Sequence, residues 1–216
     1  MDDTPIDISR IHFPIKSLGP GLRIGIWLQG CSIRCPGCIS LDTWATGRGK
    51  TTVERVVQAI EPWLDRADGF TISGGEPFDQ PRALFHLLQA IRSRHEGDIL
   101  VYSGHPLEAL PIGDFSGLID SLISDPLLID QPQTLPLRGS DNQRLHLLTS
   151  LGRNRFQFAR AAGEAMPSTL DIMFDDARGD VFLAGVPRRG DLVRLQEILE
   201  AAGHSAGITE DKQRYR

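Results

Sequence analysis

The chain has 216 residues and contains no long hydrophobic run. No segment approaches the roughly 18 consecutive apolar residues that are typical of a membrane-spanning helix. The acidic start, with Asp2 and Asp3, also lacks the positively charged and then apolar pattern of an export signal. We therefore expect a cytoplasmic protein with no membrane contact.

The chain also lacks an excess of positive charge. It has 23 Lys and Arg residues against 28 Asp and Glu residues, which gives a formal net charge of −5. A protein with this balance has no general attraction to phosphate backbones, so general nucleic-acid binding is not expected. Hydrophobic residues make up 40% of the chain and charged residues 24%, as in ordinary globular proteins, which excludes a disordered or fibrous composition.

Cysteine is scarce, and the three that are present lie in one short segment, at Cys31, Cys35 and Cys38. An odd group of thiols in a reducing compartment indicates metal ligation and not a disulfide framework. Three thiolates would leave one iron of a four-iron cube without a cysteine, and an open iron can bind a cofactor or substrate. The alternative is a structural zinc site completed by a residue such as His105, although zinc sites usually use short-spaced pairs of ligands.

Strand and helix patterns alternate over the first 123 residues. Residues 22–28 alternate between apolar and other residues, which predicts a half-buried strand after a loose lead-in at 1–20. The spacing of Thr51 and Glu54 is that of a capping box at the start of a helix, and Pro81 suits the first position of a second helix. Further strands are predicted over 70–72, 99–102 and 118–123, with another helix between the last two.

This alternation predicts parallel β-α units joined by right-handed crossovers, and therefore an α/β fold. A closed eight-stranded barrel usually takes about 250 residues, so we expect a partial, open barrel that forms one domain over 1–216. Residues 20–123 would form its core, and residues 124–216 would face a substrate or partner. The segment 124–144 has few periodic signals and is predicted to be a functional or covering loop. A two-stranded ribbon is predicted over 170–174 and 181–184, a last helix over 191–202 and a frayed tail over 211–216.

A second motif follows the predicted strand at 70–72, where α/β barrels place their ligand-binding loops. It consists of Gly74, Gly75, Glu76 and Pro77. Two adjacent glycines let the backbone approach a ligand closely, although such a pair alone more often marks an ordinary turn. The motif lies one β-α unit after the cysteine loop, so we expect both to lie at the same edge of the sheet.

Together the two motifs resemble those of the radical S-adenosylmethionine superfamily. The resemblance implies a [4Fe–4S] cluster on Cys31, Cys35 and Cys38, whose open iron binds the amino and carboxylate groups of S-adenosylmethionine. One electron from the cluster would then cleave the sulfonium to methionine and a 5′-deoxyadenosyl radical. The flanking Trp27 and Trp44 are expected to shield the cluster from water and oxygen. The residues assigned to the cofactor are Gly74, Gly75, Glu76, Ser103, Gly104 and Trp44.

Further segments resemble one branch, the activating enzymes of glycyl radical enzymes, especially the activators of anaerobic ribonucleotide reductase. These segments are 19–23, 27–31, 43–44, 102–105 and 137–144. The branch implies that the radical takes a backbone hydrogen from a glycine of a partner protein. It also implies an external electron donor of the flavodoxin or ferredoxin type. The candidate substrate or partner residues are Asp125, Arg138, Asn142 and Arg144.

Two alternatives remain open at this point. The first is a radical enzyme that acts on a small molecule, similar to the 7-carboxy-7-deazaguanine synthases, which share the short length and the same motifs. The second is a non-catalytic iron–sulfur or zinc module.

Overall fold

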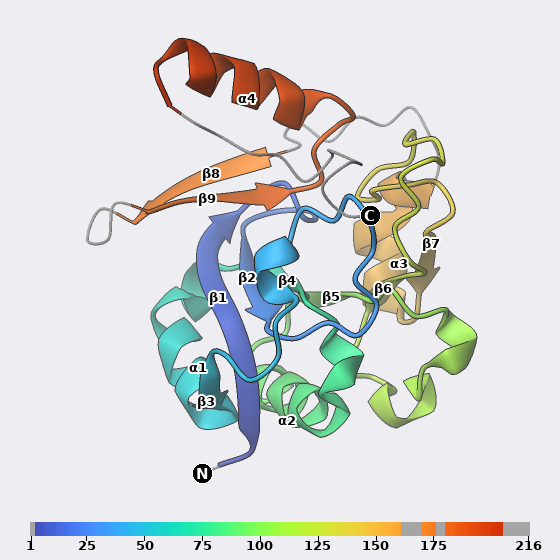
Figure 1. Cartoon of the computed structure of the whole chain (residues 1–216). Coiled ribbons are helices and arrows are strands. Elements are labelled where there is room, and N and C mark those ends of the chain that lie inside the picture. Colours follow the sequence, from blue (N-terminus) through green and yellow to red (C-terminus); the bar gives the residue numbers. More distant parts are fainter. Residues whose placement is uncertain (1–2, 161–169, 176–179, 205–216) are drawn as a thin grey trace.

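A computed structural model describes residues 3–160, 170–175 and 180–204, which are organised around a seven-stranded sheet (Figure 1). The strand order is β3-β1-β2-β4-β5-β6-β7. The central strands β2, β4, β5 and β6 run parallel, while β1, β3 and β7 pair antiparallel to their neighbours. The α/β prediction is therefore confirmed. The strands are β1 (Pro5–Ile15), β2 (Arg23–Leu28), β3 (Lys50–Thr52), β4 (Gly69–Gly74), β5 (Asp98–Tyr102), β6 (Ser121–Ser124) and β7 (Arg144–Leu147).

Both faces of the central strands are covered. One face packs against α1 (Val53–Ile60) and α2 (Pro81–Arg92), and the main core lies between these two helices and the sheet. The other face packs against α3 (Ser150–Phe156), where Leu100, Ile123 and Phe156 form a second buried cluster. All six residues of β2 are buried, so the prediction of a half-buried strand was wrong. Parallel strands covered on both faces are normally buried in this way.

The N-terminal segment contains a long strand of the sheet and is not a loose lead-in. Strand β1 pairs with β2 on one side and β3 on the other. Its Ile6 and Ile8 are buried, while Asp7 between them lies at intermediate exposure, which is the period-2 pattern of a strand. The prediction of a loose lead-in over 1–20 was therefore wrong for residues 5–15.

Two predicted helix features also differ in the structure. Helix α1 is capped by Thr52, whose side chain accepts a hydrogen bond from the Arg55 N–H, so the predicted capping box of Thr51 and Glu54 was wrong. The helix predicted between β5 and β6 was also wrong. This crossover contains two short 3-10 helices, at Leu107–Ala109 and Ile112–Phe115, each preceded by a proline. Proline disfavours helical backbone in the residue before it and cannot continue a helix.

The C-terminal ribbon and helix are confirmed. Strands β8 (Leu170–Asp175) and β9 (Asp180–Gly185) pair antiparallel, and α4 (Asp191–Ala201) follows. Figure 1 shows the ribbon and α4 at the top of the view, away from α1 and α2. The Asp171 carboxylate fastens the ribbon to the sheet by accepting hydrogen bonds of 2.8 Å from the Lys16 and Ser17 N–H groups. The tail predicted at 211–216 lies outside the described residues.

Strand β7 and helix α3 were not predicted from the sequence. Strand β7 has only four residues, too few for its alternation to stand out, and α3 has only two apolar side chains, those of Leu151 and Phe156. Strand β7 pairs with β6, and α3 packs against β5, β6 and β7, so both elements depend on these tertiary contacts. The remaining short 3-10 helices are Leu41–Thr43, Glu61–Arg66, Pro77–Asp79 and Gln157–Arg160.

None of the helices in the described part of the chain has both the length and the apolar character needed to span a bilayer.

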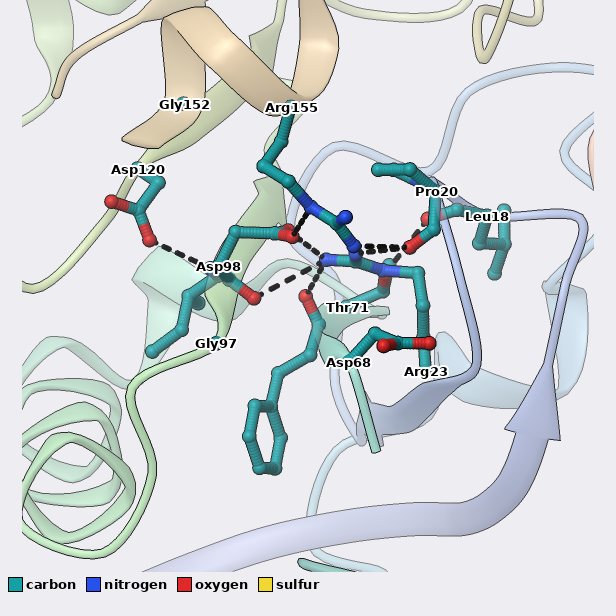
Figure 2. Close-up of polar contacts among 12 residues, drawn as sticks. Leu18, Pro20, Arg23, Asp68, Thr71, Gly97, Asp98, Asp120, Gly152 and Arg155 are labelled. Carbon is teal, nitrogen blue, oxygen red and sulfur yellow. Dashed lines mark hydrogen bonds and ion pairs between the residues drawn. The ribbon is translucent and has the colours of Figure 1, made fainter. Parts of the chain in front are cut away.

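A buried charged network, drawn in Figure 2, joins the N-terminal ends of β2 and β5. The two motifs follow the opposite, C-terminal ends of β2 and β4. Arg23 at the start of β2 is 0% exposed and donates to the Thr71 hydroxyl at 2.7 Å and the Asp98 carboxylate at 2.6 Å. Its guanidinium also donates to the carbonyls of Phe70 and Pro20. Arg155 of α3 donates to the other oxygen of Asp98 at 2.9 Å. The network therefore holds β2, β4, β5 and α3 together.

Candidate functional site

The cysteine loop begins at the C-terminal end of β2 and is closed on itself by hydrogen bonds. The Gly30 N–H donates to the Thr43 carbonyl at 2.7 Å, and the Cys31 N–H donates to the Trp44 carbonyl at 3.2 Å. The Gln29 side chain donates to the Ala45 carbonyl at 2.6 Å. These bonds bring the segment after the third cysteine back to the first, so the loop encloses its thiols.

All three thiols are free and partly buried. Burial raises the pKa of Cys35 to about 11; the backbone N–H of Leu127 opposes this, and the nearby Cys38 and Cys31 increase it further. Burial also raises the pKa of Cys38. The thiols are thus close enough for the charge of one to act on the next. A positively charged metal centre would remove this penalty, because a coordinated thiol is deprotonated outright.

The described residues contain no group of three or more His, Cys, Asp or Glu side chains that could together hold a single metal ion. In a four-iron cube each thiolate binds a separate iron, so the sulfurs do not converge on one point. His105, the residue considered for a zinc site, lies with its Nε2 3.8 Å from a carboxylate oxygen of Asp79. The donor set of three soft thiols in one loop fits an iron–sulfur cluster.

The Gly-Gly-Glu-Pro turn lies beside the start of the cysteine loop, as predicted. The Gly75 N–H donates to the Leu28 carbonyl and the Glu76 N–H donates to the Gly30 carbonyl, both at 2.8 Å. A Cβ atom on Gly75 would lie 1.9 Å from the Gly30 carbonyl oxygen, and one on Gly74 would lie 2.5 Å from the Leu28 backbone. Glycine is required at both positions because the two motifs pack backbone against backbone.

The Glu76 side chain is 1% exposed and links this turn to the segment after β5. Its carboxylate accepts hydrogen bonds from the Ser103 hydroxyl at 2.9 Å, the Gly104 N–H at 2.8 Å and the Phe78 N–H at 3.0 Å. Burial raises its pKa, and these three donors oppose the increase. The carboxylate therefore positions Ser103 and Gly104 directly. Its predicted contact with a cofactor ammonium group stays a prediction.

A cavity of about 180 Å³ opens beside the third cysteine. Its walls come from the cysteine loop, the ends of β2, β4 and β5, the 124–144 loop and the ribbon. This cavity places one thiol, the glycine turn and the C-terminal part of the chain around one space. Lining residues include Trp27, Cys38, Gly74, Tyr102, Gln143 and Leu183.

Among the candidate substrate residues, Asp125 and Arg144 bind each other. Asp125 follows β6 with φ of 82°, a left-handed conformation that is uncommon outside glycine and that clusters at functional sites. Its carboxylate accepts hydrogen bonds from the Ser124 hydroxyl at 2.8 Å and from Arg144 Nε at 2.7 Å. Arg144 also donates to Glu108 and lowers the pKa of that carboxyl to about 2. Both candidates are therefore engaged within the protein.

The other two candidates have buried polar atoms without partners. Arg138 is 4% exposed, and its Nε and Nη1 atoms have no hydrogen-bond partner. Burial lowers its pKa, and electrostatic interactions with Tyr102 and Asp141 oppose the decrease. Asn142 donates to the Pro126 carbonyl at 2.8 Å, but its Oδ1 atom is buried without a partner. Unpaired donors and an unpaired acceptor in one loop indicate a place for a polar ligand.

The sequence did not point to two residues that support the loop. The Leu127 N–H acts on Cys35, which joins the 124–144 loop to the cysteine loop. The Asp79 carboxylate accepts hydrogen bonds from the Ser32 N–H at 2.7 Å and the Ser32 hydroxyl at 2.8 Å. Backbone contacts such as that of Leu127 leave no residue signal. Asp79 lies two residues after Pro77, the last residue of the second motif, and could have been considered for that reason.

Comparison with known proteins identifies a matching family and several similar proteins. Residues 17–146 match the model of the family described as "4Fe-4S single cluster domain". The anaerobic ribonucleoside-triphosphate reductase-activating protein of Escherichia coli (strain K12) is 29% identical over 148 residues, which cover 63% of this chain and 96% of that protein. The protein of the same name from Enterobacteria phage T4 is 30% identical over 132 residues, 59% of this chain and 85% of the relative. The pyruvate formate-lyase-activating enzyme of Clostridium pasteurianum is 36% identical over 96 residues, 40% of each chain.

Proposed function

Because the chain belongs to the family of 4Fe-4S single cluster domains, among the glycyl radical enzyme activating proteins of the radical S-adenosylmethionine superfamily, we propose that it generates a glycyl radical on a partner protein. Cys31, Cys35 and Cys38 would hold the [4Fe–4S] cluster, and S-adenosylmethionine would bind beside it. One observation carries the assignment: a cavity lined by both Cys38 and Gly74 joins the thiol loop to the glycine turn.

The cluster, when bound, supplies the electron that cleaves S-adenosylmethionine to methionine and a 5′-deoxyadenosyl radical. The protein holds the cofactor in place. The turn at Gly74 and Gly75 has no side chains, so its carbonyls can accept from the cofactor ammonium group. Glu76 fixes Ser103 and Gly104 at the neighbouring strand end. Trp27, which is 4% exposed and lines the cavity, limits the access of water.

The partner's glycine segment would reach the cavity between the 124–144 loop and the ribbon, since both contribute to its wall. The four parallel strands, in sequence order across the sheet, support a partial barrel that is open on this side. An external electron donor of the flavodoxin or ferredoxin type and a cytoplasmic location belong to the same proposal. The relatives named above are activating proteins, so the comparisons do not favour the small-molecule alternative or a non-catalytic module.

Electron paramagnetic resonance tests the proposal. The reconstituted and reduced protein is incubated anaerobically with S-adenosylmethionine and an anaerobic ribonucleoside-triphosphate reductase. We expect a glycyl doublet on the reductase and one 5′-deoxyadenosine per radical. Release of 5′-deoxyadenosine without a doublet on any glycyl radical protein would redirect the assignment to a small-molecule substrate. Zinc without iron in anaerobically prepared protein would contradict it entirely.

Arg138 and Asn142 are proposed to hold the peptide backbone of the partner's glycine segment. The unpaired N–H groups of Arg138 suit a peptide carbonyl, and the unpaired Oδ1 of Asn142 suits a peptide N–H. Replacing Arg138 by methionine is expected to raise the KM for the partner about ten- to hundredfold, because a hydrogen bond from a charged group contributes about 1.5–3 kcal/mol. Steady-state rates of glycyl radical formation measure this change.

The same variant should be more stable than the parent chain when no partner is present. Removing a buried guanidinium whose Nε and Nη1 atoms have no hydrogen-bond partner favours the folded state, and about 1 kcal/mol corresponds to a rise of about 2–4 °C in the unfolding midpoint. Arg153→Met, on the exposed surface of α3, is the matched control and should change neither quantity. An unchanged KM, or a loss of stability in Arg138→Met, would instead assign Arg138 to the support of its own loop.

A further inference from the structure

The C-terminal ribbon and α4 lie beyond the family match, which ends at residue 146. The Escherichia coli relative is covered over 96% of its own length by 63% of this chain, so more than a third of this chain is not matched by that relative. The C-terminal part nevertheless contributes to the cavity beside the third cysteine, whose lining residues include Leu183, Ala184, Val186 and Leu192. Residues beyond the family domain therefore border the site that we propose for the partner.

Two contacts attach the ribbon to the seven-stranded sheet. In β8, the Asp171 carboxylate accepts hydrogen bonds from the Lys16 and Ser17 N–H groups. In β9, the buried Ala184 belongs to the same apolar cluster as Trp27. Neither contact involves the 124–144 loop, so they do not fix this loop relative to the segment that follows the ribbon.

Gln133 makes that connection. Its Nε2 donates hydrogen bonds to the Pro187 carbonyl at 2.9 Å and to the Arg138 carbonyl at 3.3 Å. Its Oε1 accepts a hydrogen bond from the Arg189 N–H at 3.1 Å. A carbonyl can only accept and a backbone N–H can only donate, so these partners fix the orientation of the amide. The Gln133 side chain thus binds both its own loop and the segment 187–189.

The Arg189 side chain supports the same connection from the C-terminal part. Its Nη2 donates a hydrogen bond to the Gly139 carbonyl at 3.1 Å. Gly139 follows Arg138 directly, and both Gln133 and Arg189 line the cavity. The backbone around Arg138 is therefore held by one side chain from its own loop and one from the C-terminal part.

We propose that Gln133 positions Arg138 for the partner's glycine segment by fixing the Arg138 carbonyl to the segment 187–189. This inference rests on the proposed function, because it requires that Arg138 binds the partner. The Nε and Nη1 atoms of Arg138 have no hydrogen-bond partner, so bonds to its backbone contribute to holding the guanidinium in place. A binding group keeps its productive geometry only when the contacts behind it are fixed. The C-terminal part thereby becomes part of the partner site.

Gln133→Leu tests the inference, because leucine has a similar size and removes all three hydrogen bonds. We expect the KM for the anaerobic ribonucleoside-triphosphate reductase to rise about five- to tenfold, while kcat for glycyl radical formation stays within about twofold. Gln131→Leu is the matched control in the same loop, because the exposed Gln131 side chain forms no hydrogen bond within the described part of the chain. Its KM should equal that of the parent.

Combination with Arg138→Met distinguishes positioning of Arg138 from general support of the loop. Two residues that act through one interaction are not additive, so Gln133→Leu should change KM by less than about twofold once Arg138 is replaced. An equal effect in both backgrounds, or an unchanged KM in Gln133→Leu alone, would overturn the inference. Absence of a glycyl doublet with the parent protein would overturn the proposed function itself.

Hydrogen exchange, followed by mass spectrometry, measures the contact in the absence of a partner. The Arg189 amide should exchange about two- to tenfold faster in Gln133→Leu than in the parent, because the variant removes its acceptor. The rate in Gln131→Leu should equal the parental rate. Equal rates in the parent and in Gln133→Leu would contradict the Gln133 contact, and would overturn the inference while leaving the proposed function intact.

Discussion

Replacing Cys38 by serine is expected to abolish the formation of 5′-deoxyadenosine. The cluster is proposed to depend on three thiolates, and an alcohol is a much poorer ligand for iron–sulfur clusters than a thiolate. Changes of outer-shell partners alone usually cost about 10- to 100-fold in metal affinity or activity, so loss of a direct ligand should exceed about 100-fold. The measurement is 5′-deoxyadenosine by chromatography, alongside iron and sulfide content per chain.

Serine at Cys31 or Cys35 should have the same effect, because each thiolate would bind its own iron. Ser32→Ala is the control within the loop: it removes one hydroxyl contact with Asp79, while the backbone N–H of residue 32 still donates to that carboxylate. It should keep full iron content and most of the activity. Undiminished product formation by any of the three serine variants would show that the cleavage chemistry does not depend on that thiol.

The parts of the site that could be predicted from the sequence are those with short-range chemical patterns. Three cysteines in eight residues, and two glycines before a glutamate after a strand, each combine residue types that few other roles require. The close packing explains the glycines: a side chain on Gly75 would collide with the Gly30 carbonyl. Helix α2 was also predicted from the helical spacing of its apolar residues, and the ribbon from two apolar runs on either side of a turn-like segment.

The rest depends on contacts between distant segments. The unpartnered atoms of Arg138 and the position of the Trp44 indole exist only once the loops are folded, and no local pattern marks them. The contacts of Glu76 within the protein could not be predicted from the sequence either. Its residue type predicts a charged contact for a ligand, whereas its carboxylate is bound to Ser103, Gly104 and the Phe78 N–H.

Resemblance to a family also does not distinguish residues that take part in the reaction from residues that stabilise the fold. The segment 19–23 resembles the activating proteins as much as the cysteine loop does, yet it lies at the opposite end of the parallel strands. Gly19 and Gly21 have φ of 136° and 78°, and a Cβ on Gly19 would lie 2.8 Å from the Arg23 side chain. Gly19 thus makes room for the buried arginine and Gly21 makes room for Asp68, so this segment serves the stability of the fold.

Replacing Arg23 by methionine is accordingly expected to lower the free energy of unfolding by about 3–5 kcal/mol. The variant leaves the Asp98 carboxylate, 0% exposed, with Arg155 as its remaining charged partner. It also deprives the Thr71 hydroxyl and three backbone carbonyls of a donor. Arg66→Met is the matched control: Arg66 is exposed and lies over the Phe13 ring, so its loss should cost less than about 1 kcal/mol. Urea unfolding of the reduced, metal-free proteins, followed by tryptophan fluorescence, gives both values.

A double substitution distinguishes a stabilising ion pair from a buried pair that is costly to break. Arg23→Met combined with Asp98→Leu removes both charges, and apolar residues in place of a buried pair are often neutral or stabilising. Asp98 also binds Arg155, so the double variant leaves that guanidinium without a carboxylate, although its 32% exposed side chain can still be hydrated. We therefore expect the double variant to recover part of the loss. If each single variant costs no more than Arg66→Met, the network does not hold the strand ends together.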